Sequence, residues 1–292
     1  MRNNFLEYLS MEKRFSPHTC LAYKKDITQF EDFAGVQRDA DLREIDSRLI
    51  RGWIVDLMEQ GLKATSVNRK LSSLRTYFKW LLKEGVVSAS PMQVVKGPKN
   101  EKRLPMFAKK QDLDQKKVDS IFDLSEFDGI RDMLMFEFFY QTGIRLSELI
   151  ELKDVDVAAD RIKVLGKRNK ERIIPISKDL SLKIERYKES RDELSVIGDF
   201  FFVLNNGKKL YPKFVYRKIN GYLGEATDLE KKSPHVLRHT FATHMLNNGA
   251  GLEILKELLG HANLSATQVY THNSFAELTK IYSQSHPRGR QN

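Results

Sequence analysis

Five of the seven histidines in this 292-residue chain lie between His235 and His272, and this density marks the region as a candidate reactive site. His235 and His239 stand four residues apart, but Val236 occupies the position where a zinc metalloprotease helix needs Glu. The Asp and Glu residues are not spaced to hold the magnesium ions of a two-metal nuclease. The sequence therefore argues against a metal site.

Phosphate chemistry fits the segment 233–239 better. Pro234 is typical of the first turn of a helix, so His235 and Arg238 are expected on one helical face, three residues apart. A guanidinium donates a rigid fork of N–H groups to phosphate oxygens, an imidazole can transfer a proton, and the helix N-terminus adds partial positive charge. A single His-x-x-Arg pair is common, so the pattern needs support from elsewhere in the chain.

Four boxes together supply that support through a resemblance. Residues 235–244 resemble the second arginine box of the tyrosine recombinases, the phage integrase family, in its Xer-like form. Residues 142–149 are similar to the family's first arginine box and residues 166–172 to its β-hairpin lysine box. Residues 258–262 with 270–272 are similar to its closing box. The order of the four boxes is that of the family, and the likeness covers almost the whole chain.

The resemblance implies six residues that act on a DNA phosphodiester. They are Arg145, Lys167, His235, Arg238, His261 and Tyr270. Arg145 and Arg238 would clamp the phosphate, Tyr270 would attack it, and Lys167 would protonate the leaving hydroxyl. A phenol has a pKa of about 10, so Tyr270 needs a proton acceptor, and His235 is the candidate base.

Two more residues, Glu148 and His239, would support these six by the same resemblance. Lys170 is a rival to Lys167 for the general acid. Lys167 is preferred because it directly follows Gly166, as in the family pattern.

The resemblance implies a site-specific recombinase that works through a 3′-phosphotyrosine without metal, ATP or other cofactor. Its partner would be double-stranded DNA, bound by a homo- or hetero-tetramer that assembles on two DNA sites from protein that is monomeric in solution. A second recombinase is a possible partner. The short N-terminal region before the helical part weakly favours an Xer-like role in chromosome dimer resolution.

Three alternatives stay open. An integrase or invertase of a mobile element would use the same chemistry. An architectural DNA-binding protein could keep the fold without activity, although every expected catalytic position is occupied. A type IB topoisomerase would relax DNA without site preference.

The fold expected for these boxes is mainly α with a small antiparallel β-sheet. Residues 1–90 carry four amphipathic stripes, which predict a helical bundle like the family's SAM-like core-binding domain. The fourth stripe carries basic side chains off its apolar face, which are candidates for DNA binding or for a solvated surface. They are Arg69, Lys70, Arg75 and Lys79. Residues 91–107 are basic and rich in Pro and Gly, which predicts an interdomain linker.

Residues 108–292 are expected to form the mixed α/β catalytic domain. Helical stripes at 112–124 and 127–141 precede a predicted β-hairpin made of residues 161–165 and 172–176. A third apolar run, residues 200–204, is a candidate third strand. Near the end, a small amphipathic helix precedes a polar tail from Ser285 to Arg290. In the family such a helix docks into a neighbouring protomer.

Composition agrees with this assignment. The net charge is +10, from 49 Lys and Arg against 39 Asp and Glu, which favours a polyanionic partner. Cys20 is the single cysteine, so no intrachain disulfide is possible and a reducing compartment is expected. The sequence has no signal peptide and no apolar run of membrane-spanning length, so the expected location is the cytoplasm.

Overall fold

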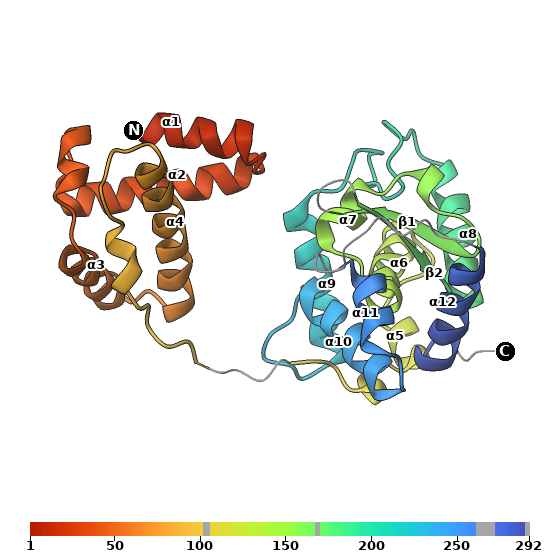
Figure 1. Cartoon of the computed structure of the whole chain (residues 1–292). Helices are drawn as coiled ribbons and strands as arrows, with labels where there is room; N and C mark the ends of the chain where they lie inside the picture. The colour runs from red at the N-terminus through yellow and green to blue at the C-terminus, as the bar shows by residue number, and fades with distance from the viewer. Residues whose placement is uncertain (102–105, 167–169, 261–271, 290–292) are drawn as a thin grey trace. The chain divides into compact units, whose positions relative to one another are not determined.

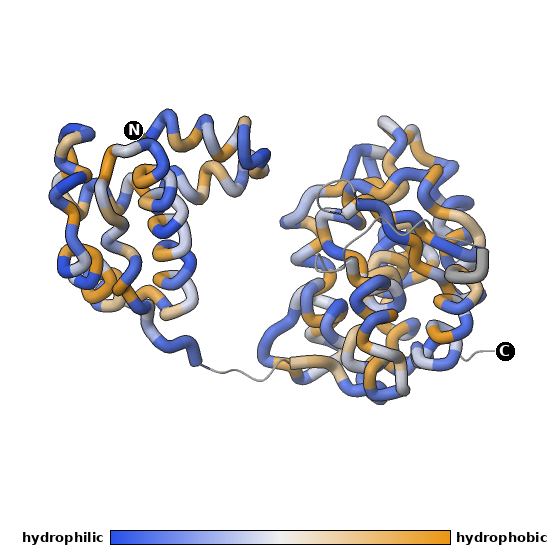
Figure 2. Tube along the Cα trace, viewed as in Figure 1, coloured by the Kyte–Doolittle hydropathy of each residue, from blue (hydrophilic) through white to orange (hydrophobic). Residues whose placement is uncertain are grey.

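The computed structural model describes residues 1–101, 106–166, 170–260 and 272–289. The chain divides into two compact units, Met1–Arg103 and Leu104–Asn292. Apolar positions turn toward the interior of each unit and polar positions toward its surface (Figure 2). None of the helices in these ranges is long and apolar enough to cross a membrane.

The N-terminal unit is a bundle of four α-helices, as the four stripes predict (Figure 1). They are α1 (Arg2–Glu7), α2 (Pro17–Ala34), α3 (Ser47–Glu59) and α4 (Ala64–Lys83). The hydroxyl of Ser16 caps α2 by accepting a hydrogen bond from the Thr19 amide at 3.2 Å. In the core, Phe30 and Trp53 meet edge to face with ring centroids 5.1 Å apart.

The C-terminal unit contains eight further α-helices and two strands in the described residues. They are α5 (Gln115–Asp119), α6 (Phe127–Thr142), α7 (Leu146–Glu151), β1 (Arg161–Leu165), β2 (Glu171–Pro175), α8 (Lys178–Asp192), α9 (Pro212–Ala226), α10 (Pro234–Asn247), α11 (Leu252–Leu259) and α12 (His272–Ser285). Almost every residue of α6 is buried, so it forms the centre of this unit (Figure 1). The predicted hairpin is present, with β1 and β2 antiparallel.

Two expected elements of this unit differ from the prediction. Instead of one continuous helix, the stretch 112–124 contains the end of a short 3-10 turn, Lys110–Leu113, and the five-residue α5. The run 200–204 does not join the sheet, and it makes only isolated bridges, Lys153 with Phe200 and Val203 with Lys209. Successive strand residues point to opposite faces. Phe201 and Phe202 are both fully buried, so the core surrounds this run on both sides and it lacks the exposed face of a hairpin strand.

The predicted polar tail that follows the last helix is packed into the unit at two of its described residues. His286 and Arg288 are buried, at 0% and 5% exposure. The His286 Nε2–H donates to the carbonyl of Tyr140 (3.2 Å), and Nδ1 accepts the Arg288 amide (3.1 Å), which requires a neutral imidazole. Burial lowers the pKa of His286 to about 3. The guanidinium of Arg288 donates to the carboxylate of Glu137 at 2.9 Å and so ties the tail to α6.

Replacing Arg288 by Met is expected to lower the free energy of unfolding by about 3 kcal/mol, because it leaves Glu137 buried with a poorer set of partners. Burial alone would raise the pKa of Glu137, but Arg288 and Lys183 outweigh it and lower the pKa to about 2, from an ordinary 4.5. The ion pair therefore contributes fully above pH 4.5 and loses its contribution as the pH falls toward 2. Urea unfolding of both proteins at pH 7 and pH 3 checks both points.

The matched control is Arg217→Met, which removes an exposed arginine from α9 and should change stability little. A gap between wild type and Arg288→Met that stays constant from pH 7 to pH 3 would contradict the role given to Glu137.

Candidate active site

Two of the predicted site residues, Arg145 and Arg238, donate to carbonyls at the ends of α6 and α11. α6 ends at Gly143, whose φ of +59° is left-handed and favours glycine. A Cβ there would lie 2.6 Å from Cδ1 of Phe241 on α10 and 2.9 Å from Cδ2 of Leu259 on α11. Glycine therefore permits both the turn and the close packing of α10 and α11 against it. The turn delivers Arg145 at the start of α7.

Arg145 is held in place by its neighbours while part of its side chain stays accessible. Its amide and its Nη1 donate to the two oxygens of Glu148, at 2.8 and 2.7 Å, and its Nη2 donates to the carbonyl of Gly260 at 3.2 Å. The side chain is 27% exposed. A guanidinium has five N–H donors, so Arg145 keeps donors for a further anion.

Arg238 lies on α10, as the helix predicted from Pro234 requires. Its guanidinium donates to the carbonyl of Gly143 and to that of Leu259, the latter at 2.7 Å, so it connects the ends of α6 and α11. Burial, together with the cationic Arg145 and Arg172, lowers the pKa of Arg238 to about 9. The group is still protonated at neutral pH, and a bound anion would relieve the repulsion between the cations.

Glu148 is the carboxylate that Arg145 and Arg172 share. Burial alone would raise its pKa, but hydrogen bonds and charge from Arg172 and Arg145 lower it to about 2. Glu148 is therefore ionised at neutral pH. One carboxylate faces three guanidiniums, so these four side chains carry a surplus of positive charge.

His235 is exposed in the first turn of α10 and His239 is half-buried on the same helix. Lys167, His261 and Tyr270 lie outside the described residues. Two described glycines flank them in sequence. Gly260, before His261, accepts the hydrogen bond from Arg145. A Cβ on Gly166, before Lys167, would lie 3.9 Å from Oε1 of Glu148. Among the described residues no group of three or more metal-ligating side chains is found.

Sequence reasoning missed one residue of this cluster, Arg172. It lies on β2 opposite Val164, at a position that faces the core, and it is 4% exposed. Its guanidinium forms a two-pronged ion pair with Glu148. The other inward positions of the hairpin are apolar (Ile162, Val164 and Ile174), and an arginine in that series is the signal that could have identified it.

The basic residues of α4 have partners within the N-terminal unit. Arg69 and Lys70 pair with Asp26, which is 1% exposed, and Arg75 donates to the carbonyl of Val95 at 3.2 Å. Burial would raise the pKa of Asp26, but hydrogen bonds from Arg69, Ser73 and Lys70 lower it. Lys79 is exposed. The structure thus gives three of the four predicted DNA-binding side chains a contact inside the bundle.

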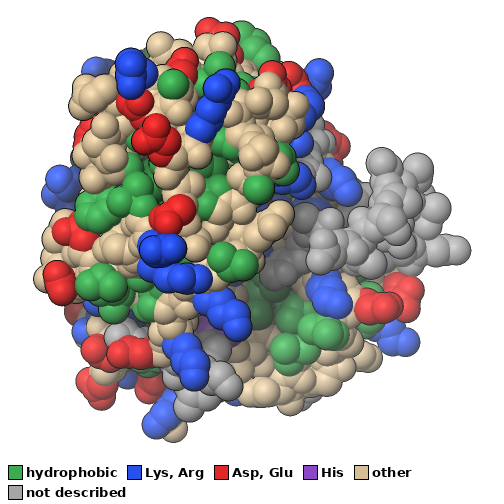
Figure 3. Space-filling model, turned by 60° about the vertical axis from the view of Figure 1, so that its left-hand side comes forward, with side chains coloured by type: hydrophobic (Ala, Val, Ile, Leu, Met, Phe, Trp, Pro, Cys, Tyr) green, Lys and Arg blue, Asp and Glu red, His purple; other side chains and the backbone are tan. Residues whose placement is uncertain are grey.

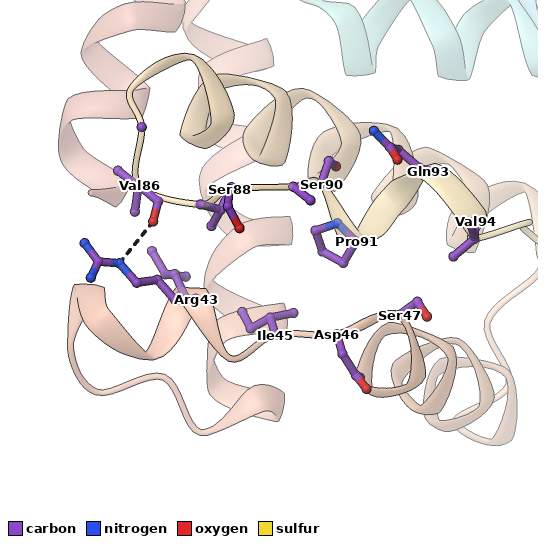
Figure 4. A pocket seen from close by; sticks show the side chains of 14 residues that line it. Arg43, Ile45, Asp46, Ser47, Val86, Ser88, Ser90, Pro91, Gln93 and Val94 are labelled. Atoms are coloured by element: carbon purple, nitrogen blue, oxygen red, sulfur yellow. Dashed lines mark hydrogen bonds between the residues drawn. The ribbon is translucent and has the colours of Figure 1, made fainter.

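A hollow in the N-terminal unit lies between residues 42–47 and residues 85–94 (Figure 4). Arg43 closes one end through a 3.1 Å hydrogen bond from Nε to the carbonyl of Val86. The lining is mostly small or aliphatic and contains none of the predicted site residues. We assign it no part in the reaction.

The chain matches known proteins over nearly its full length. Residues 111–277 match the phage integrase family, and residues 3–85 match the phage integrase N-terminal SAM-like domain. Tyrosine recombinase XerC of Thermodesulfovibrio yellowstonii is 37% identical over 99% of this chain and 96% of its own. XerC of Bacillus subtilis is 36% identical over 97% and 95%.

A solved structure shares the fold. The XerH site-specific recombinase bound to palindromic difH substrate has a TM-score of 0.73 at 20% identity, covering 97% of this chain and 84% of that one. The mostly helical architecture with one small antiparallel sheet is thus the fold of these recombinases. The chain belongs to the phage integrase family and is a tyrosine recombinase of the Xer-like kind.

Proposed function

We propose that this recombinase cleaves one DNA strand with the hydroxyl of Tyr270, holds it as a 3′-phosphotyrosine, and releases it to the 5′-hydroxyl of a partner strand. The observation that carries this proposal is the pair Arg145 and Arg238, which donate to the successive carbonyls of Gly260 and Leu259 at the end of α11, with Arg145 also held by Glu148. The transition state gathers negative charge on the phosphate oxygens. Cations preorganised there stabilise it without having to reorganise.

The remaining roles follow the family pattern. Lys167 is proposed to protonate the leaving 5′-hydroxyl, and His235, exposed on the turn beside Arg238, to accept the phenol proton. His261 and His239 complete the set. A tyrosyl ester conserves the energy of the phosphodiester, so rejoining needs no ATP.

Double-stranded DNA is the proposed substrate. The positive surplus at the site and the net charge of +10 both favour it. Many Lys and Arg side chains are exposed in the view of Figure 3. We further propose that the 91–107 stretch serves as the linker between domains 1–90 and 108–292. The protein would act in the cytoplasm as a tetramer on two DNA sites, in chromosome dimer resolution.

The test is to capture covalent protein–DNA adducts. The protein is incubated with genomic DNA of its source, denatured, and freed of unbound DNA, and the attached DNA is sequenced. Peptide mapping then identifies the modified residue. Adducts on Tyr270 at one or a few chromosomal sequences are expected. Adducts at scattered sequences would instead indicate a topoisomerase. Adducts at the ends of a mobile element would indicate an integrase.

Lys79→Ala is expected to weaken DNA binding about equally for all sequences and to reduce the slope of log K against log salt by about 1, because one exposed cation is lost. The melting temperature should not change. Asp26→Asn, in contrast, should lower the melting temperature, because Arg69 and Lys70 lose their buried ionic partner. Salt-dependent fluorescence anisotropy and thermal melting of both variants check this. An unchanged salt slope for Lys79→Ala would show that Lys79 does not contact the DNA.

A further inference from the structure

Arg172 is a buried cation that none of the proposed roles uses. Its Nε donates to the carbonyl of Leu258 at 2.8 Å, and its Nη1 and Nη2 donate to the two oxygens of Glu148 at 2.9 and 2.7 Å. All three nitrogens are thus engaged inside the protein. With 4% of its surface exposed, Arg172 has no path to a DNA phosphate.

Three residues near this guanidinium, Glu148, Gly166 and Gly260, either hold a proposed catalytic residue or precede one in the sequence. Glu148 holds Arg145. A Cβ on Gly260, which precedes His261, would lie 3.2 Å from Arg172 Nη1, and a Cβ on Gly166, which precedes Lys167, would lie 3.7 Å from the same atom. The guanidinium therefore fills the space between three segments that are distant in sequence.

The end of α11 aligns Arg172 with the two proposed phosphate clamps. Its last carbonyls lack partners within the helix and carry partial negative charge. Leu258 accepts from Arg172, Leu259 from Arg238, and Gly260 from Arg145. Three consecutive carbonyls thus each receive one guanidinium, and their spacing sets the spacing of the arginines.

We propose that Arg172 is a positioning residue for strand cleavage. It fixes the Glu148 carboxylate so that Arg145 projects its remaining donors to the phosphate, and it ties the hairpin that carries Lys167 to the end of α11 before His261. This inference rests on the proposed function, because it acts through Arg145. A lysine cannot reproduce a fork that pairs with both oxygens of Glu148 while also reaching Leu258.

The test uses a synthetic duplex that carries a sequence recovered from the covalent adducts. Single-turnover cleavage rate, DNA dissociation constant and melting temperature are measured for wild type, Arg172→Met and Arg172→Lys. Arg172→Met should lower the cleavage rate about 10- to 100-fold, the range for a misplaced catalytic group, and leave the dissociation constant within about twofold. Arg172→Lys should recover only part of the rate. It also keeps the test open if the Met variant fails to fold.

A second background separates positioning from general stabilisation. If Arg172 acts through Arg145, then Arg172→Met should cost less than about threefold in a protein that already carries Arg145→Lys. Equal losses in both backgrounds, together with a matching fall in melting temperature, would reduce Arg172 to a structural residue. Arg161→Met removes an arginine from the neighbouring strand β1 and serves as the control, so it should leave the cleavage rate unchanged in both proteins.

The two proposals fail in different ways. A folded Arg172→Met protein that cleaves at the wild-type rate would overturn the positioning role. If Arg145→Lys still lowers the cleavage rate strongly, the proposed function is unaffected by that result. Wild-type cleavage by Arg145→Lys would overturn the proposed function itself.

Discussion

Tyr270→Phe is expected to abolish the covalent adduct while leaving DNA affinity unchanged. The substitution removes only the phenolic oxygen, which is the atom proposed to form the bond to phosphorus. The arginines proposed to hold the phosphate, and the other basic side chains, are unchanged by it. Loss of adduct to below detection, with a dissociation constant within about twofold of wild type, is the expected result.

The matched controls for this substitution are Tyr211→Phe and Tyr216→Phe. Both tyrosines belong to the same unit, and they are 44% and 48% exposed. Neither change should alter adduct formation. Denaturing gels after incubation with labelled DNA measure the adduct, and fluorescence anisotropy measures binding. An adduct that persists in Tyr270→Phe would mean that another side chain is the nucleophile.

The helix-borne part of the site could be predicted from the sequence because its determinants are local. Pro234 begins α10, and the three-residue spacing to Arg238 follows from helix geometry. Gly143 ends α6 in the left-handed conformation, so the turn before Arg145 is also determined by a residue close to it in sequence.

The buried arginines could not be predicted in the same way. Arg172 is buried because Glu148, 24 positions away, neutralises it, and Arg288 because Glu137, 151 positions away, does the same. Local polarity indicates an exposed residue in both cases, and only the folded chain supplies the partner.

On the basic face of α4, the sequence predicts exposed cations that the fold partly pairs. The residue types predict a cationic surface, but Asp26 of α2 approaches this face and pairs with Arg69 and Lys70. Which of the four cations are available for a phosphate is therefore decided by packing between helices. Lys79 remains exposed, and Arg69, although paired, is 53% exposed.

Arg238→Ala is expected to lower the single-turnover cleavage rate by a factor of about 10²–10³, the usual cost of removing one preorganised donor from a transition-state site. Arg238→Lys should be almost as damaging. A lysine keeps the charge, but its single nitrogen cannot both hold the carbonyls of Gly143 and Leu259 and present a fork to phosphate.

Arg238 also connects two helix ends, so a loss of rate has to be separated from a loss of structure. Removing it relieves repulsion with Arg145 and Arg172, the repulsion that contributes to its lowered pKa, and this gain offsets part of the lost hydrogen bonding. The melting temperature of Arg238→Ala should therefore fall only slightly, so that loss of folded protein does not account for the lower cleavage rate. The exposed Arg217 of α9, replaced by Ala, gives the control for losing a positive charge alone. A cleavage rate within threefold of that control would show that Arg238 does not stabilise the transition state, and the charge surplus around Glu148 would then need another explanation.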